Sequence, residues 1–214
     1  MTHDVEPSTQ HVELGGLDLQ FDDRVLRPRE WTLAQSTWAA ELLRDAAPGP
    51  VLELFAGVGH IGLAAVAGND RQLVQVDLNP VACAFARRNA EAAGLAHRVE
   101  VRQGRIDEVV GDDETFRVVI ADPPWVPTAG IGAFPEDPSI AIDGGDDGLA
   151  LARASCAVID RHLDAGGAAV LQLGDAGQAD AVGQHLARTA STLRVVEVRQ
   201  FDRGVLVRLE RRDG

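Results

Sequence analysis

The chain has 214 residues and a mass of 22.7 kDa, which suits one domain of ordinary size or one domain with a short appendage. Apolar residues make up 45% and charged residues 25%, which excludes a chain that is disordered by composition. The formal charge of −13 disfavours a DNA or RNA partner, because nucleic-acid binders usually carry a basic field. No stretch approaches the roughly 20 uninterrupted apolar residues of a membrane span, and the polar N-terminus shows no secretory signal.

The residue types that are present and absent restrict the chemistry. Cys83 and Cys156 lie in Ala-rich, helical-looking stretches and are predicted to be buried free thiols of a cytoplasmic protein. All twenty basic residues are arginine, and tyrosine is absent. This excludes a phosphate-loop lysine, a Schiff-base lysine and acid–base chemistry by tyrosine or lysine. GxSxG is also absent, which excludes the usual nucleophile elbow, and no metal site is expected.

The N-terminal part reads as a short appendage. Residues 1–10 are predicted to be a loose tail. Apolar and polar residues then alternate over 12–21 around Gly-Gly, which predicts a β-hairpin. A helix should follow, with Trp38 and Leu42 on one apolar face, and Pro-Gly-Pro at 48–50 ends it.

From residue 51 the pattern changes to short apolar runs separated by helical stretches. Continuous apolar strands between helices indicate a parallel sheet covered on both faces. The predicted strands are 51–54, 73–76, 99–101, 118–121 and 168–173, with helices such as 81–93 and 149–162 and a closing hairpin of 193–201 and 204–209. We therefore expect a doubly wound α/β domain (48–214) with a mostly parallel seven-stranded sheet and an antiparallel C-terminal strand. Residues 1–47 would supply the tail, the hairpin and a lid helix.

In such sheets ligands bind beyond the carboxyl ends of the strands. After the first strand, Gly57, Gly59 and Gly62 form GxGxxG, a pattern that lets a ligand approach the turn and the helix N–H groups closely. Asp77 ends the second strand and can accept the hydroxyls of a ribose. The alternatives are a tight strand-to-helix turn and an Asp that caps the next helix. Together the motifs favour a ligand that contains adenosine, either NAD or S-adenosylmethionine.

The fourth strand ends in Asp122-Pro123-Pro124-Trp125. Two prolines cannot continue a central strand, because they lack backbone donors and have a fixed φ. The Asp122 carboxylate and the Pro123 carbonyl can instead accept both protons of a planar amino group, while Trp125 stacks on its face. Such positioning can supply much of the barrier of a transfer reaction. The alternative is a surface Pro-Pro turn with a half-buried tryptophan.

Three strings together resemble the class I S-adenosylmethionine-dependent methyltransferases. They are VLELFAGVGHIGL (51–63), VDLNPVACAFARRNAEAAG (76–94) and ADPPW (121–125). The last is similar to the (Asn/Asp)-Pro-Pro-aromatic motif of amino-group methylators. A fourth string, DGGDDGL (143–149), resembles a segment of the HemK-type protein-glutamine methyltransferases, which modify release factors.

The resemblance implies S-adenosylmethionine as the cofactor and S-adenosylhomocysteine as the product. It places the methionine part at Glu53 and the glycine loop, the ribose at Asp77, and the adenine near Leu78, Asn79, Arg105 and Ile106. The implied cofactor-binding residues are Glu53, Phe55, Ala56, Gly57, Gly59, Asp77, Leu78, Asn79, Arg105, Ile106 and Asp122. The implied catalytic residues are Asp122, Pro123 and Trp125, and those expected on the substrate side are Pro124, Trp125 and Phe134.

The chain departs from the family in three ways. Gly104-Arg105 stands where members commonly have Gly-Asp, and Asp-Pro-Pro-Trp replaces the Asn-Pro-Pro-Tyr of the glutamine methylators. The roughly 50 residues before Val51 also leave no room for the helical docking domain of bacterial HemK-type enzymes.

The leading interpretation is an N-methyltransferase that acts on a planar amide or amine nitrogen, such as a protein glutamine side chain. A small-molecule amine is a second acceptor and an RNA or DNA base a third. Two further classes of protein remain open, an NAD-dependent oxidoreductase and a non-catalytic methyltransferase-like scaffold. The expected partner is a methyl-acceptor protein or small molecule in the cytoplasm, since an acidic surface suits a basic protein.

Overall fold

The structure is a computed structural model that describes residues 8–212. The strands are β1 (Gln10–Leu14), β2 (Leu17–Phe21), β3 (Val51–Leu54), β4 (Leu73–Asp77), β5 (Val99–Gln103), β6 (Phe116–Ala121), β7 (Leu163–Leu173), β8 (Leu193–Phe201) and β9 (Gly204–Arg211). The helices are α1 (Leu33–Asp45), α2 (His60–Val66), α3 (Pro80–Ala92), α4 (Ala150–His162) and α5 (Ala176–Arg188), with short 3₁₀ turns at Glu30–Thr32, Ala96–Arg98, Thr128–Ala133 and Ser139–Ala141.

The main sheet has the strand order β5-β4-β3-β6-β7-β9-β8. Strands β3 to β7 pair in parallel with their neighbours, whereas β9 runs antiparallel to both β7 and β8. This confirms the predicted doubly wound, mostly parallel seven-stranded sheet with an antiparallel C-terminal strand. The strand order reverses at β3, because β4 and β5 continue on one side of it and β6 and β7 on the other. A ligand crevice is expected beyond the carboxyl end of β3 for this reason.

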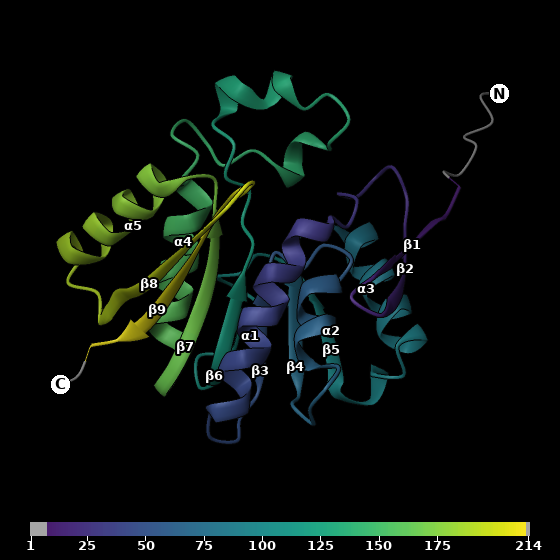
Figure 1. Ribbon diagram of the computed structural model, residues 1–214, viewed down its shortest axis with the longest axis horizontal. Coiled ribbons are helices and arrows are strands. Elements are labelled where there is room, and N and C mark those ends of the chain that lie inside the picture. Colours follow the sequence, from purple (N-terminus) through teal and green to yellow (C-terminus); the bar gives the residue numbers. More distant parts are fainter. Residues whose placement is uncertain (1–7, 213–214) are drawn as a thin grey trace.

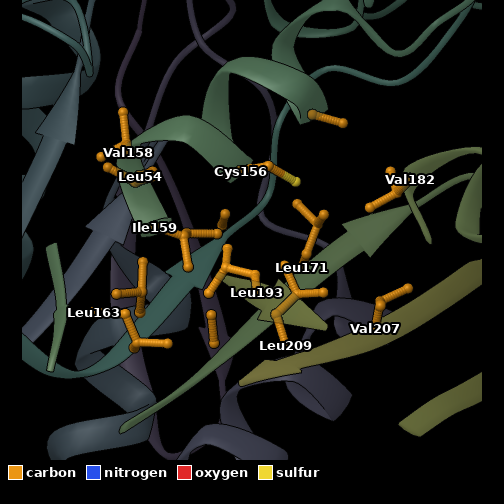
Figure 2. Packing of buried hydrophobic residues seen from close by; sticks show 14 of the residues in the cluster. Leu54, Cys156, Val158, Ile159, Leu163, Leu171, Val182, Leu193, Val207 and Leu209 are labelled. Carbon is orange, nitrogen blue, oxygen red and sulfur yellow. The ribbon is translucent and has the colours of Figure 1, made fainter. Parts of the chain in front are cut away.

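The sheet is covered on both faces, as continuous apolar strands require. In β3, Val51 faces the cluster that contains side chains of α1 and α2, while Leu52 and Leu54 face the cluster with α4 and α5. Figure 2 shows the second cluster, where Ile159 of α4 and Val182 of α5 surround the sheet residues. Each fully buried Leu, Ile or Val contributes roughly 1.5–3 kcal/mol, so this packing stabilises the sheet and the helices that cover it.

The N-terminal region shares this core. Trp38 of α1 is 1% exposed and packs against Val170 and Leu206 of the sheet, so α1 is part of the cover of the sheet (Figure 1). The hairpin is fastened to α3 by Asn89, whose side chain accepts from Gln20 N at 2.8 Å and donates to Gln20 O at 3.1 Å.

The ends of the chain add two observations. Residues 1–7 of the predicted tail lie outside the described part, and Gln10 already begins β1. Within residues 8–212, no helix combines the length and the apolar character that a membrane crossing requires.

Candidate active site

A cavity of about 680 Å³ opens beyond the carboxyl ends of β3, β4 and β6, where the reversal of strand order places it. Its rim combines three segments that are far apart in the sequence: residues 25–32, the long connection after β6, and the β8–β9 turn. In Figure 1 the connection between β6 and α4 arches above the ends of the strands. Residues 25–32, which we call the lid segment, thus lie at the cavity ahead of α1, and their role as a lid stays a prediction.

The glycine loop forms the floor beside β3. Phe55, Gly57 and Gly59 have φ of 59°, 53° and 87°, a left-handed conformation that glycine adopts without strain and that costs a phenylalanine free energy. A Cβ on Gly57 would meet nothing within 4 Å, because this residue faces the open cavity. The loop thus presents bare backbone to whatever binds there.

Glu53 supports this loop from below. Its carboxyl group accepts hydrogen bonds from Gly62 N at 2.9 Å and from Gln75 Nε2 at 2.6 Å, and the residue is 1% exposed. Burial outweighs both donors and raises its pKa to about 8. Glu53 and Gly59 are not among the residues that line the cavity. Glu53 holds the loop from behind, and the contact of both residues with the cofactor stays a prediction.

Asp77 joins the loop to the end of β4. Its carboxylate accepts from Gly57 N at 2.7 Å and from Asn79 N at 2.8 Å, and burial raises the pKa of this carboxyl group. The Asn79 side chain caps α3 by accepting from Val81 N at 2.9 Å, whereas Leu78 is 54% exposed. A carboxylate held in this way faces the cavity and can accept from the hydroxyl groups of a ligand.

The Asp122–Trp125 turn forms the opposite wall. Burial raises the pKa of Asp122 to about 7. Among the described residues, no side chain or backbone group donates to the Asp122 carboxyl group or to the Pro123 carbonyl. Both oxygens belong to cavity-lining residues. The turn therefore carries two acceptors without a protein donor at the cavity, and their use by a ligand stays a prediction.

The DGGDDGL segment backs this turn. Val126 N donates to Ile142 O and Gly144 N to Val126 O, at 3.0 and 2.8 Å, so the two segments pair directly. At Gly148, with φ of +71°, a Cβ would lie 2.4 Å from the Trp125 carbonyl oxygen. Glycine is needed at position 148 because its backbone lies against that of Trp125. The segment therefore holds Trp125 in place.

The lid segment is anchored at two points. Arg29 Nη2 donates to Asp137 Oδ1 at 2.5 Å, which ties the lid to the long connection after β6. Thr32 donates its hydroxyl proton to Arg29 O at 2.6 Å and lies 2.9 Å from His60 Nε2. Because the hydroxyl proton is already used, His60 is the donor in that contact, and burial lowers its pKa to about 4. His60 is thus a neutral wall residue that holds the lid.

Arg105 lines the cavity at the end of β5 with its charge already paired. Its Nε and Nη2 donate to the two Asp107 carboxylate oxygens at 3.1 and 3.0 Å. Asp107 lines the cavity as well, so a carboxylate is present at this end although Arg105 replaces the acidic residue of the family pattern.

Residues 51–130 match the family model described as the methyltransferase domain. The chain contains a methyltransferase domain. Its fold is that of the S-adenosylmethionine-dependent methyltransferases, as predicted. Two solved structures share it: ribosomal protein L11 methylase from Lactobacillus delbrueckii (TM-score 0.64, 16% identity, 90% of this chain and 84% of that one), and an RNA methyltransferase from Salinibacter ruber in complex with S-adenosylhomocysteine (TM-score 0.57, 16% identity, 86% and 92%).

Curated relatives of this methyltransferase domain are protein methylators by name. The release factor glutamine methyltransferase of Geobacter sulfurreducens is 36% identical over 184 residues, which are 83% of this chain and 62% of that protein. The ribosomal protein uL3 glutamine methyltransferase of Bordetella pertussis is 34% identical over 177 residues, 78% of this chain and 58% of that protein. The chain thus spans about three fifths of the length of these relatives.

The structure brings most of the predicted site residues of the domain to one cavity. Those that line it are Phe55, Ala56, Gly57, Asp77, Leu78, Asn79, Arg105, Ile106, Asp122, Pro123, Pro124, Trp125 and Phe134. The sequence reasoning missed the β8–β9 turn, whose Asp202, Arg203 and Gly204 also line the cavity. The hairpin was predicted, but nothing in its sequence indicates that its tip, beside the carboxyl end of β7, lines the cavity.

Proposed function

We propose that the chain is an S-adenosylmethionine-dependent N-methyltransferase that acts on a planar amide nitrogen, with a protein glutamine side chain as the acceptor. The observation that carries this proposal is the pair of unused acceptors, the Asp122 carboxyl group and the Pro123 carbonyl, in the wall of the same cavity as the bare glycine loop. A dinucleotide oxidoreductase would have no use for these two oxygens.

The cavity fits the cofactor by size, shape and charge. Its volume of about 680 Å³ is within the range of small-molecule and cofactor sites, and the open face of Gly57 admits a ligand against the backbone. More carboxyl than guanidinium groups line it, which suits a cationic sulfonium compound. Phe55 to Gly57 would hold the methionine part and Asp77 the ribose, while Arg105 and Ile106 would flank the adenine. When bound, the cofactor supplies a methyl group on a positively charged sulfur.

The chain's own residues would orient the acceptor. Asp122 and the Pro123 carbonyl each accept one N–H of the amide, which fixes the nitrogen in the wall of the cavity, and Trp125 packs on the amide plane. Such orientation removes much of the entropic barrier of a displacement. In the transfer that the bound cofactor would support, the carbon–sulfur bond would break as the nitrogen–carbon bond forms, leaving a neutral thioether. The nitrogen would then give up one proton, which the Asp122 carboxylate, with a pKa of about 7, can accept.

Two findings support a protein glutamine as the acceptor. The curated relatives are named for methylation of glutamine in release factors and in ribosomal protein uL3, and the DGGDDGL segment holds the turn that would grip the amide. The net charge of −13 favours a basic protein over a nucleic acid. Substrates of this kind belong to translation, so we place the activity in the cytoplasm.

The test is incubation of the purified chain with methyl-labelled cofactor and, separately, with the release factors, ribosomal protein uL3, RNA and small-molecule fraction of the same organism. We expect label in a protein and, by peptide mass spectrometry, a single methyl group on a glutamine. Asp122→Ala is the control and should leave no label. Label only in RNA or in the small-molecule fraction would overturn the assignment of the acceptor, and binding of NAD but not of S-adenosylhomocysteine in calorimetry would overturn the reaction class.

A further inference from the structure

Two glutamine amides from different parts of the chain hold the ends of the Asp122–Trp125 turn. Gln35 of α1 donates from Nε2 to the carbonyl of Ala121, directly before the turn, at 2.9 Å. Gln178 of α5 donates from Nε2 to the carbonyl of Trp125, the last residue of the turn, at 3.0 Å. Neither glutamine lines the cavity, so both act on the turn from behind.

The two prolines limit the number of backbone hydrogen bonds that can hold this turn in place. Pro123 and Pro124 have no backbone N–H, and the donor that the structure shows from this turn to a neighbouring strand is Asp122 N, which lies 3.4 Å from Leu54 O of β3. The carbonyl groups at its two ends can add support by accepting from donors elsewhere in the fold. An amide N–H is a suitable donor, since glutamine carries two of them on one flexible side chain.

Gln35 ties the turn to the sheet. Its Nε2 also donates to Val170 O of β7 at 3.0 Å, so one amide bridges the last residue of β6 and a residue within β7. Both partners are carbonyl oxygens, which means that this end of the amide is the donor. The Oε1 atom is buried without a partner, which costs stability. The fold therefore keeps a glutamine here in spite of an unsatisfied acceptor.

Gln178 ties the turn to the corner between β7 and α5. Its Oε1 accepts from Gly174 N at 2.8 Å while its Nε2 reaches the Trp125 carbonyl. The Trp125 ring lies against Gly174, where a Cβ would be 2.6 Å from Cε3. Side chain and backbone of Trp125 are thus both fixed to the same corner.

We propose that Gln35 and Gln178 are positioning residues for methyl transfer: they set the two acceptor oxygens of the turn by holding its carbonyl groups at both ends. The inference rests on the proposed function, because the acceptors matter only if they grip a substrate amide. It adds to that function two residues that touch neither substrate nor cofactor. A misplacement of about 1 Å in such a site can cost on the order of a hundred-fold in rate.

Gln178 is the better residue to test, since it is half-buried and its substitution leaves the core intact. Gln178→Met keeps the length of the side chain but removes both hydrogen bonds. Gln178→Glu keeps the acceptor for Gly174 N and places an oxygen against the Trp125 carbonyl. Gln184→Met is the matched control, because Gln184 is exposed on the same helix.

We expect both Gln178 variants to lower kcat by about ten-fold or more, with the dissociation constant of S-adenosylhomocysteine changed by less than about two-fold. Gln184→Met should match the parent chain in both. A Gln178→Met variant with the kcat of Gln184→Met would overturn the inference, as would a loss that follows cofactor affinity instead of kcat.

A second readout does not depend on the acceptor. The indole N–H resonance of Trp125, assigned with Trp125→Phe among the 3 tryptophans of the chain, should shift or broaden in Gln178→Met and stay in place in Gln184→Met. If the chain methylates no glutamine but this resonance responds, the proposed function fails while the support of the turn by Gln178 stands. If the resonance is unchanged in Gln178→Met, the positioning role of Gln178 is refuted.

Discussion

The glycine loop offers a sharp test, because Gly62 lies directly above the buried carboxyl group of Glu53. A Cβ at position 62 would lie 2.3 Å from Glu53 Oε2 and 2.9 Å from its Cδ. In an ordinary helix, Gly→Ala stabilises by up to about 1 kcal/mol. Here the extra methyl overpacks the site, at a cost of about 1–3 kcal/mol. It also pushes Glu53 away from its two donors, and each donor or acceptor left unpaired costs about 1–3 kcal/mol more.

We therefore expect Gly62→Ala to lower the free energy of unfolding by about 2–5 kcal/mol in urea titrations. Gly68→Ala is the control, because a Cβ there would meet nothing within 4 Å. Shortening the acid in the double variant Gly62→Ala/Glu53→Asp should restore part of the loss, which a double-mutant cycle measures. A Gly62→Ala variant as stable as Gly68→Ala would refute the role given to Glu53.

Two further predictions concern the pH and the Trp125 wall. The folded chain holds a proton on Glu53, with a pKa of about 8, that the unfolded chain loses near 4.5. The free energy of unfolding should therefore fall as the pH rises from about 4.5 to 8, by up to about 5 kcal/mol at about 1.4 kcal/mol per pKa unit. Urea titrations of Glu53→Gln across this range should show a weaker dependence of stability on pH. The same dependence in Glu53→Gln and in the parent chain would contradict the raised pKa of Glu53. Gly174→Ala, whose Cβ would lie 2.6 Å from the Trp125 ring, should lower kcat but not S-adenosylhomocysteine affinity. Gly183→Ala, with its nearest contact at 3.8 Å, should change neither, and equal kcat in the two variants would argue against a catalytic role of the ring position.

Much of the fold follows from local sequence. Continuous apolar runs predicted the parallel strands, and the end of each run located the loops that meet at the cavity. The glycine loop and the Asp-Pro-Pro-Trp turn could be placed on the same edge of the sheet because the carboxyl ends of parallel strands meet there.

What the sequence could not show is contact between distant segments. Gln35 lies 86 positions from Ala121 and Gln178 lies 53 positions from Trp125, and neither belongs to a motif. The family resemblance implies that Glu53 binds the cofactor, and the structure adds that its carboxyl group accepts from Gly62 N and Gln75 Nε2. Both faces of a central strand are packed, so the alternation of residues along it does not show which side chains face the cavity and which lie behind the loop.

The central claim is that Asp122 and the Pro123 carbonyl hold the acceptor nitrogen. The most direct measurement compares turnover and S-adenosylhomocysteine affinity of Asp122→Ala and Asp122→Asn with those of the parent chain across pH 6–8. Because Asp122 ionises with a pKa of about 7, the activity of the parent chain should rise through that pH. Asp122→Ala should bind the product within several-fold of the parent chain and turn over no substrate. Asp122→Asn keeps an acceptor oxygen but cannot take up the proton, so its turnover should be lowered and should lose that pH dependence. Normal turnover by Asp122→Ala would contradict the account.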